Sequence, residues 1–289
     1  MFLYIPNKLF NHLLNHFFTF QNNRFFRLVS VSLFRLVSTK GDFRIWIKGH
    51  RMHANTFDRI IVLLLWRLSF LEDFESKIIN NIIKEGMTII DVGSNIGFHT
   101  LQFAKLVGSK GKVFAFEPDY ENFCLLKKNI KENNYQNIIA EKKAISDKTG
   151  EAKLYICEEH KGDHRIFYSG DDRKVSLVET TTLDDFFKNE KIDIDFIKLD
   201  IQGAEYLAIK GMENIIKGNK NLIIISEFAP YLLEKCGTPA EEYIAKLIDL
   251  GFNINLINEK KGKVESITID ELIKICKQHG YVNLYLNKD

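Results

Sequence analysis

Cysteine and long apolar runs are scarce in this chain, and each of these two scarcities excludes a class of protein. The 289 residues include only four cysteines and four prolines. The cysteines are scattered and form no C-x-x-C pair, which argues against a disulfide-stapled secreted domain and for a reducing compartment. They also exclude the close three-cysteine cluster that a radical enzyme needs for an iron–sulfur centre. The cysteines are Cys124, Cys157, Cys236 and Cys276.

Acidic residues are absent from the first 40 positions. This segment carries five lysines and arginines and many Phe and Leu residues, so the rest of the chain, from a total of +2, has a net charge of −3. No window reaches the roughly 18 uncharged apolar residues of a membrane span, and there is no signal-peptide order or cleavage site. The composition of residues 1–40 therefore predicts a basic aromatic helical extension. It either lies on an anionic membrane surface or packs its Phe and Leu face on the rest of the protein.

The charge balance gives no overall pull toward nucleic acid, so we expect no nucleic-acid partner. We expect a cytoplasmic protein, and we leave open peripheral contact with the inner face of the membrane through residues 1–40. A homo-oligomer built through the N-terminal helices also stays open. Apolar residues make up 45% of the chain, which is enough for one large domain with a sizeable core.

The chain is organised around Met87–Tyr120, which reads as a strand, a glycine turn, a helix and a second strand. The strands are apolar on both faces, as in a parallel sheet covered on both sides. Glycines in the turn allow a tight bend, and the following helix start offers free N–H groups. An acid at the end of the second strand can accept hydrogen bonds from a ribose diol. The candidate cofactor-binding residues are Asp91, Gly93, Ser94, Asn95, Gly97, Glu117 and Asp119.

The details of the turn favour one nucleotide over the others. A dinucleotide site has the pattern G-x-G-x-x-G, but Asn95 stands at the middle glycine, and no Gly-Lys-Ser/Thr of a P-loop follows. The turn opens with the acid Asp91, which suits a ligand with a positive amino group and no phosphate. S-adenosylmethionine fits, because it carries a sulfonium, an ammonium and a ribose diol. An NAD-like cofactor and a non-binding unit stay open as alternatives.

Three stretches resemble one family. IIDVGSNIGFHT, FAFEPDYENFCLLKKNI and IKLDIQGAE are similar, in order and spacing, to the signature stretches of FkbM-type S-adenosylmethionine-dependent methyltransferases. The resemblance covers roughly Phe70–Tyr285. It implies an α/β class I methyltransferase (Rossmann-like) fold, with a seven-stranded, mostly parallel sheet that ends in an antiparallel edge hairpin. We accordingly expect the helical extension at 1–40, a strand–helix cap region at 41–85, and the S-adenosylmethionine-binding methyltransferase domain at 86–289.

Further site candidates lie beyond the glycine turn. In this class of fold the loop after the third strand lines the adenine, which makes Ala144 and Ile145 candidate contacts. The loop His160–Ser169 is polar and glycine-bearing, so we expect it to face substrate, or else to be a surface loop with internal salt bridges. Two apolar strands end in the acids Asp200 and Glu227. The substrate-binding candidates are Asp163, His164, Arg165, Gln202 and Glu205.

The resemblance implies O-methylation of a hydroxyl on a sugar, a polyketide or another secondary metabolite. A hydroxyl nucleophile needs a general base. The candidates are Asp200, Glu227 and His164, ranked in that order for lying near the methyl group, whereas His164 has the unperturbed pKa best matched to a base. The chain departs from the commoner family form by having Gln202 where an acid usually stands, which suggests a positioning role there, with Asp200 or Glu205 carrying the charge. We expect no metal, since Cys157, His160 and His164 lack a second pair of ligands nearby.

Two competing functions remain. The first is an NAD-dependent oxidoreductase, against which Asn95 weighs. The second is a non-catalytic, membrane-associated scaffold that has kept the fold. Among local elements, we predict an apolar helix at Arg59–Phe70 and helix caps at Thr182, Thr238 and Thr268, of which the one at Thr238 is a capping box.

Overall fold

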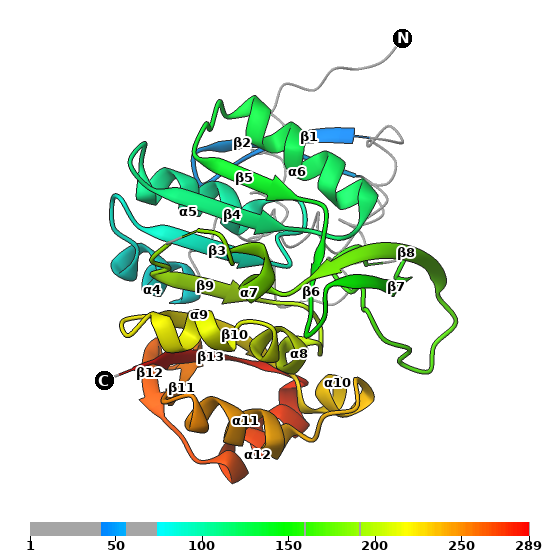
Figure 1. Ribbon diagram of the computed structural model, residues 1–289, viewed down its shortest axis with the longest axis vertical. Coiled ribbons are helices and arrows are strands. Elements are labelled where there is room, and N and C mark those ends of the chain that lie inside the picture. The colour runs from blue at the N-terminus through cyan, green and yellow to red at the C-terminus, as the bar shows by residue number, and fades with distance from the viewer. Residues whose placement is uncertain (1–41, 56–73, 159, 191, 289) are drawn as a thin grey trace, which may run out of the picture.

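An eight-stranded sheet forms the centre of the protein in a computed structural model, which describes residues 42–55 and 74–289 except 159, 191 and 289 (Figure 1). In spatial order the strands are β12 (Lys263–Ser266), β11 (Asn253–Asn258), β13 (Val282–Asn287), β10 (Ile223–Phe228), β9 (Phe196–Leu199), β3 (Thr88–Val92), β4 (Lys112–Phe116) and β5 (Ile138–Glu141). The neighbours from β10 to β5 are all parallel. Strands β13, β11 and β12 then continue the sheet antiparallel to their neighbours.

The antiparallel edge was expected, but the sheet has one strand more than the seven predicted. The extra strand is β12, which pairs antiparallel with β11 at the edge. Its sequence, Lys-Val-Glu-Ser, contains a single apolar residue. An edge strand packs little against the core, so it does not need the apolar alternation that makes a strand visible in sequence.

Helices cover both faces of the sheet, because successive strand residues point to opposite sides. On one side Ile89, Val113 and Phe196 pack with α4 (Phe74–Ile82) and α5 (Phe98–Val107). On the other side Ile90, Phe114 and Ile197 lie in a separate core cluster. The helices that contribute to that cluster are α7 (Leu183–Phe186), α8 (Glu205–Lys210), α9 (Glu213–Gly218), α10 (Pro230–Lys235), α11 (Ala240–Asp249) and α12 (Ile269–His279). This two-sided burial explains the uniformly apolar strands.

Two smaller sheets flank the large one. The hairpin of β1 (Asp42–Ile47) and β2 (His50–Asn55) packs against α6 (Tyr120–Glu132). A three-stranded sheet contains β6 (Ala144–Ile145), β8 (Lys174–Thr181) and β7 (Gly150–Ile156). In Figure 1 the β7–β8 pair projects from the side of the molecule toward which the parallel strands point. The loop between β7 and β8 contains the polar stretch singled out in the sequence.

The predicted caps are confirmed at two of three helices. Thr182 accepts a hydrogen bond from the backbone N–H of Asp185, and Thr268 forms a complete capping box with Glu271. The predicted capping box at Thr238 is wrong, because Pro239 occupies the N-cap position of α11 and no side chain caps that helix. The predictions for residues 1–40 and for the helix at Arg59–Phe70 lie outside the described residues. Within the described ranges, no helix has the length and apolar character required to cross a membrane.

Candidate active site

Close contacts with neighbouring segments require glycine at two positions of the turn. Gly93 has a φ of +84°, and a side-chain carbon there would lie 2.0 Å from the backbone oxygen of Asp200. A side-chain carbon on Gly97 would come within 2.7 Å of Leu126. Both glycines therefore let the turn pack against the loop after β9 and against α6. This packing places the β9 loop directly beside the turn.

Asp91 closes β3 and is buried. The Thr100 hydroxyl, on the first turns of α5, donates a hydrogen bond of 2.5 Å to its carboxylate. Burial raises the pKa of Asp91 to about 6, although Thr100 and the charge of Lys198 act in the opposite direction. Asp91 thus ties the start of α5 to the end of β3, and its prediction as a cofactor contact stays a prediction.

Glu117 follows β4 directly and hydrogen-bonds to the backbone of the glycine turn. Its two carboxylate oxygens accept backbone hydrogen bonds from Asn95 (2.8 Å) and Asp119 (2.9 Å). Burial raises the pKa of Glu117 to about 8. Asp119 in turn caps α6 by accepting from the N–H of Asn122. The Asn122 side chain also hydrogen-bonds to Glu117, and the remaining lone pair of the carboxylate can accept from a ligand hydroxyl.

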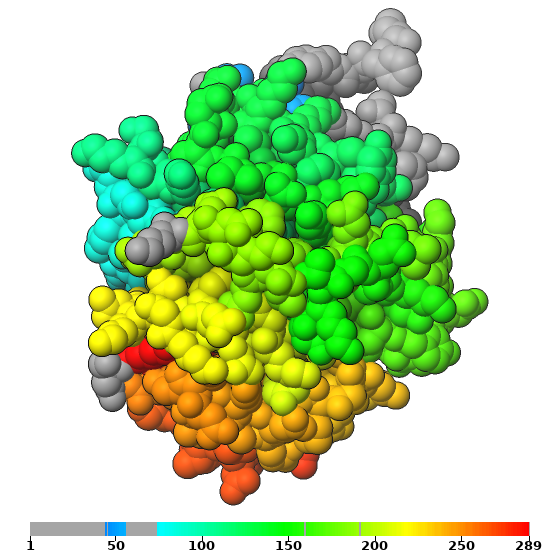
Figure 2. Space-filling model, in the orientation of Figure 1, coloured from blue at the N-terminus to red at the C-terminus, as the bar shows by residue number. Residues whose placement is uncertain are grey.

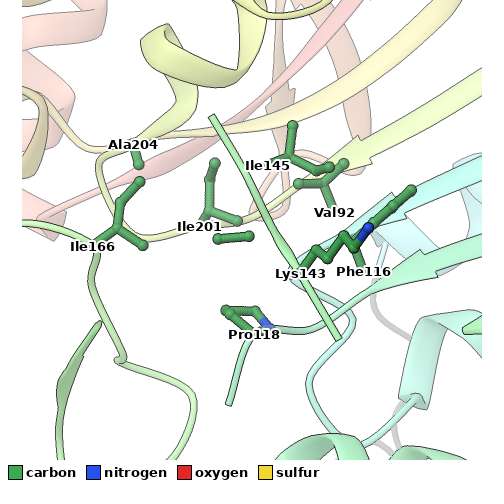
Figure 3. Close-up of a pocket in the computed structure, with 10 residues that line it drawn as sticks. Val92, Phe116, Pro118, Lys143, Ile145, Ile166, Ile201 and Ala204 are labelled. Atoms are coloured by element: carbon green, nitrogen blue, oxygen red, sulfur yellow. The ribbon is translucent and has the colours of Figure 1, made fainter. Parts of the chain in front are cut away.

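An apolar pocket opens at the ends of β3 and β4, where Phe116 and Pro118, the chain neighbours of Glu117, line it (Figure 3). Ala144 and Ile145, the two candidate adenine contacts, both line it. The remaining lining residues are Val92, Gly93, Phe116, Pro118, Lys143, Ile166, Ile201 and Ala204. A flat, mostly apolar group such as a purine base suits these walls.

Ser94 supplies the donor that a bound nucleotide would meet. Its hydroxyl is buried and has no hydrogen-bond partner within the described part of the chain. A buried hydroxyl without a partner is costly and points to a ligand or water that completes it. The pocket walls, the acceptor capacity of Glu117 and the free Ser94 hydroxyl together fit S-adenosylmethionine.

The loop after β7 is fastened over the turn. The backbone oxygen of Lys161 accepts hydrogen bonds from the side chains of Asn95 (3.0 Å) and Asn122 (2.8 Å). The Lys161 ammonium pairs with Glu121 at 3.1 Å. Asn95, the residue that replaces a dinucleotide-type glycine, therefore holds a neighbouring loop through its side chain.

The same loop contains internal salt bridges. Asp163 accepts from Arg165 at 2.7 Å and from Arg173 at 2.8 Å, and all three side chains are largely buried. This network satisfies Asp163 and Arg165 within the protein, as in the alternative interpretation of the sequence. Their prediction as substrate contacts stays a prediction.

His164 is oriented by two neighbours. Its Nδ1 accepts a hydrogen bond of 3.1 Å from the backbone N–H of Cys157, and its Nε2 lies 3.8 Å from a carboxylate oxygen of Asp119. Burial lowers the pKa of His164 to about 4. Because Nδ1 accepts, the neutral ring carries its proton on Nε2 and keeps no free lone pair. This arrangement disfavours His164 as a general base.

Asp200, Gln202 and Glu227 meet at the ends of β9 and β10. The Gln202 side-chain amide donates to Asp200 at 2.9 Å and lies 3.3 Å from the nearer oxygen of Glu227. Gln202 holds this position with a φ of +54°, a region that few residues other than glycine adopt. Burial, followed by the charge of Asp200, raises the pKa of Glu227 well above its usual value, whereas the Asp200 side chain is 40% exposed. The expected positioning role of Gln202 agrees with this geometry.

Two members of this cluster were missed in the sequence. The Lys198 ammonium is buried 3.5 Å from Glu75 on α4 and 3.6 Å from Asp200. Burial alone would lower the pKa of Lys198, but the surrounding carboxylates, led by that of Glu75, outweigh it and raise the pKa. The available signal was a lysine in the middle of an otherwise apolar strand, since a buried lysine requires acidic partners.

Glu205 stabilises the loop between β9 and α8 through hydrogen bonds to its backbone. It is fully buried, and its carboxylate accepts from the backbone N–H groups of Ile201 (3.0 Å) and Gly203 (2.9 Å). These contacts bend the chain between β9 and α8 and so fix the place of Gln202. In the structure the exposed charge at this edge therefore comes from Asp200.

Comparison with known proteins decides the family. The family model described as "Methyltransferase FkbM domain" matches residues 91–282, which include the turn, Glu117 and the Asp200 cluster. The chain belongs to the FkbM methyltransferase family. S-adenosylmethionine is the cofactor of this family, and the fold is the class I methyltransferase fold expected from the sequence. This membership argues against the NAD-dependent oxidoreductase, and the non-catalytic scaffold is tested by the activity measurement proposed below.

Curated relatives match part of the chain. Hexuronic acid methyltransferase AglP of Haloferax volcanii is 26% identical over 166 residues, which are 56% of this chain and 65% of that protein. A protein-L-isoaspartate O-methyltransferase of Methanococcoides burtonii is 38% identical over 56 residues, or 19% of this chain and 28% of that protein. The chain thus spans less than two thirds of the length of these relatives.

Solved structures with a similar arrangement are distant in sequence. An S-adenosylmethionine-dependent O-methyltransferase of Thermotoga maritima has a TM-score of 0.44 and 15% identity, with 88% of this chain and 80% of that one covered. The TYW2 protein of M. jannaschii in complex with AdoMet has a TM-score of 0.43 and 11% identity, with 86% of each chain covered.

Proposed function

We propose that this methyltransferase transfers a methyl group to a hydroxyl of a sugar or glycan. The observation that carries the proposal is the Asp200–Gln202–Glu227 cluster, which lies against the glycine turn and presents a half-exposed carboxylate at the ligand edge. The sugar acceptor is supported by the hexuronic acid methyltransferase relative, which shares 26% identity with this chain over 166 residues.

Four residues of the pocket and the turn would hold the cofactor. Ala144 and Ile145 would contact the adenine, Glu117 would accept hydrogen bonds from the ribose, and Ser94 would donate to a polar group. S-adenosylmethionine supplies a methyl group on a sulfonium, which is already an activated leaving group. The protein therefore has to align the acceptor and exclude water.

Asp200 is the base in this proposal. Its side chain is 40% exposed, so it can reach an acceptor hydroxyl, whereas Glu227 is almost fully buried. One Asp200 oxygen accepts from Gln202 and the other lies 3.6 Å from Lys198, so both contacts hold the carboxylate in place. The proton of the acceptor hydroxyl would move to this carboxylate as the oxygen becomes nucleophilic. Glu227 fixes Gln202 from the other side.

The test compares Asp200→Asn with the unaltered chain on uronic-acid oligosaccharides, with methyl transfer followed by mass spectrometry. Loss of a general base is expected to lower kcat by about 10²- to 10⁴-fold. The dissociation constant for S-adenosylmethionine, measured by calorimetry, should change less than about threefold, because the carboxylate is assigned to the acceptor. An unchanged kcat would remove Asp200 from the role of base.

The chemical nature of the product distinguishes a hydroxyl from a carboxylate acceptor, since a hexuronic acid carries both. A methyl ether survives mild alkali, whereas a methyl ester is hydrolysed. The proposal therefore predicts an alkali-stable product. An alkali-labile product would show that the acceptor is the carboxylate, which needs no general base at neutral pH.

Peripheral membrane contact through residues 1–40 and a homo-oligomer stay predictions, since these residues lie outside the described ranges. Cosedimentation of the intact chain with phosphatidylglycerol vesicles, compared with phosphatidylcholine vesicles, tests the first. We expect the anionic vesicles alone to retain the chain if the basic segment lies on a membrane surface. Retention by neither vesicle would favour packing of the segment on the domain. Light scattering of the intact chain tests the second.

A further inference from the structure

Exposed aromatic side chains gather at one edge of the protein. In the described part of the chain, five aromatic side chains are exposed: Trp46 (57%), Tyr120 (67%), Tyr168 (63%), Tyr231 (62%) and Tyr281 (54%). Single exposed rings are ordinary. Here, however, the four tyrosines all belong to segments at the edge where the parallel strands end, and the tryptophan alone lies elsewhere, on the β1–β2 hairpin.

The topology places three of these tyrosines at the edge. Tyr120 is the first residue of α6, directly after β4, and Tyr231 is the second residue of α10, directly after β10. Tyr281 precedes β13, whose first residue, Val282, pairs with Phe228 at the carboxyl end of β10. Asn283, two residues after Tyr281, pairs with Glu227, so the strand that follows Tyr281 lies beside the acid cluster.

The fourth tyrosine comes from the β7–β8 loop. The Tyr168 ring lies 5.8 Å from that of Tyr155 on β7. Gly170, two residues further along this loop, lies close to α10. A side-chain carbon at Gly170 would be 4.0 Å from the ammonium of Lys235 on that helix. The space-filling view shows the surfaces of β7–β8 and α10 side by side (Figure 2). The loop with Tyr168 and the helix with Tyr231 are therefore neighbours.

Two of the rings carry a lysine on one side. The Lys142 ammonium lies 5.4 Å from the Tyr120 ring centre, and the Lys235 ammonium lies 5.6 Å from the Tyr231 ring centre. A lysine over one face of a ring stabilises its orientation and leaves the opposite face for a ligand. The exposed fractions of 67% and 62% agree with an open second face.

The chemistry of this edge favours a sugar. A pyranose ring has an apolar face of C–H groups and a rim of hydroxyls, which match the flat apolar face and the hydroxyl of a tyrosine. The rings also come from four separate segments, so they can contact more than one sugar unit.

We propose that Tyr120, Tyr168, Tyr231 and Tyr281 form an acceptor platform on which the pyranose rings of an oligosaccharide stack, with Tyr281 next to the acid cluster. This inference rests on the proposed function, because it specifies how the sugar acceptor is held. It adds that the acceptor is an oligosaccharide instead of a free monosaccharide. It also assigns acceptor binding to residues that the family's signature stretches leave out, except for Tyr120.

The test measures methyl transfer to tetragalacturonate and to galacturonic acid with the full chain. The variants are Tyr231→Ala, Tyr281→Ala and the double variant, and Trp46→Ala is the matched control for loss of an exposed ring away from the edge. We expect KM for the tetramer to rise about tenfold for each tyrosine removed, the size typical of one stacked aromatic contact. The control variant should leave KM unchanged. Because the substituted rings are exposed, folding should be unaffected.

A second readout separates the platform from the proposed function. The calorimetric affinity for S-adenosylmethionine should be equal in all variants, and the tetramer should have a lower KM than the monosaccharide in the unaltered chain. Methyl transfer with the same KM in every variant would overturn the platform and leave the function standing. Absence of transfer to any sugar, with S-adenosylmethionine still bound, would overturn the proposed function and the platform with it. Competition by polyuridylate that is lost in the tyrosine variants would assign the rings to nucleic acid and overturn the sugar.

Discussion

Glu117 is the residue whose charge state is most closely connected to cofactor binding. With a pKa raised by burial to about 8, it is mostly protonated at pH 7 in the free protein. Hydroxyl donors from a ribose favour the charged carboxylate and so lower its pKa. We therefore predict that S-adenosylmethionine binding at pH 7 releases up to one proton. Calorimetry in two buffers of different ionisation enthalpy measures this release.

Glu117→Gln is the control for this prediction, because it keeps the shape and cannot ionise. Proton release equal in both chains would assign the titration to another group. The stability of the free protein should also depend on the protonation of Glu117. Between about pH 4.5 and 8 the folded state holds a proton on Glu117 that the unfolded state has lost, so stability should fall as pH rises. The Gln variant should show a flatter dependence of melting temperature on pH over this range.

Lys198 neutralises the acids around it. Replacing it with Met keeps the aliphatic volume but leaves the buried carboxylate of Glu75 without its cation, and the opposing charge near Asp91 and Glu227 is also lost. Removal of one partner from a buried pair costs about 3–5 kcal/mol. We predict a loss of this size in the free energy of unfolding by urea. The double variant Lys198→Met/Glu75→Gln should recover part of it, and no recovery would contradict the pairing.

At the scale of elements, two asparagines attach the β1–β2 hairpin: Asn129 on α6 and Asn133, the C-cap residue that follows this helix. Asn129 is fully buried. Its side chain accepts from the N–H of His53 at 2.6 Å and donates to the backbone oxygens of His53 (3.1 Å) and Ile96 (2.8 Å). Asn133 makes the equivalent pair of bonds to Arg51 at an exposed position. Because Ile96 lies in the glycine turn, Asn129 connects the hairpin with the cofactor site.

This difference in burial gives a matched pair of variants. Asn129→Ala leaves three buried backbone groups unpaired and should cost about 2–4 kcal/mol of unfolding free energy, whereas Asn133→Ala should cost less than about 1 kcal/mol, since water replaces its bonds. Asn129→Ala should also speed amide hydrogen exchange in both β2 and the glycine turn. Faster exchange confined to β2 would show that the hairpin and the turn are independent.

Comparison of sequence and structure at this scale shows where local patterns suffice. The β3–α5–β4 unit, the caps at Thr182 and Thr268 and the acid at Glu117 follow from short-range signals, because glycine turns, cap residues and strand ends act on their own neighbours. The capping box at Thr238 failed because Pro239 competes for the same position. The Glu75–Lys198 pair joins residues 123 positions apart, and no local pattern reports such a contact.

At the scale of the whole molecule, cofactor binding should stabilise the folded chain. Glu117, Ser94 and the apolar pocket come from several segments that are together only in the folded state. A ligand that binds this state alone adds about 2.7 kcal/mol at a concentration of 100 times its dissociation constant. We predict a rise in melting temperature of several degrees with S-adenosylmethionine and no rise with NAD at equal concentration. A larger rise with NAD would contradict the interpretation of the turn.

The large sheet ends on both sides in a short strand. Strand β5 and strand β12 each contain four residues, and β12 also carries Lys263 and Glu265. A long, flat, apolar edge would offer unpaired N–H and C=O groups to another chain, which is how folded β-proteins begin to aggregate. Here the first extra strand to dock would find few such groups and, at β12, two charges. Lengthening β12 with apolar residues should therefore make the protein precipitate at a lower concentration.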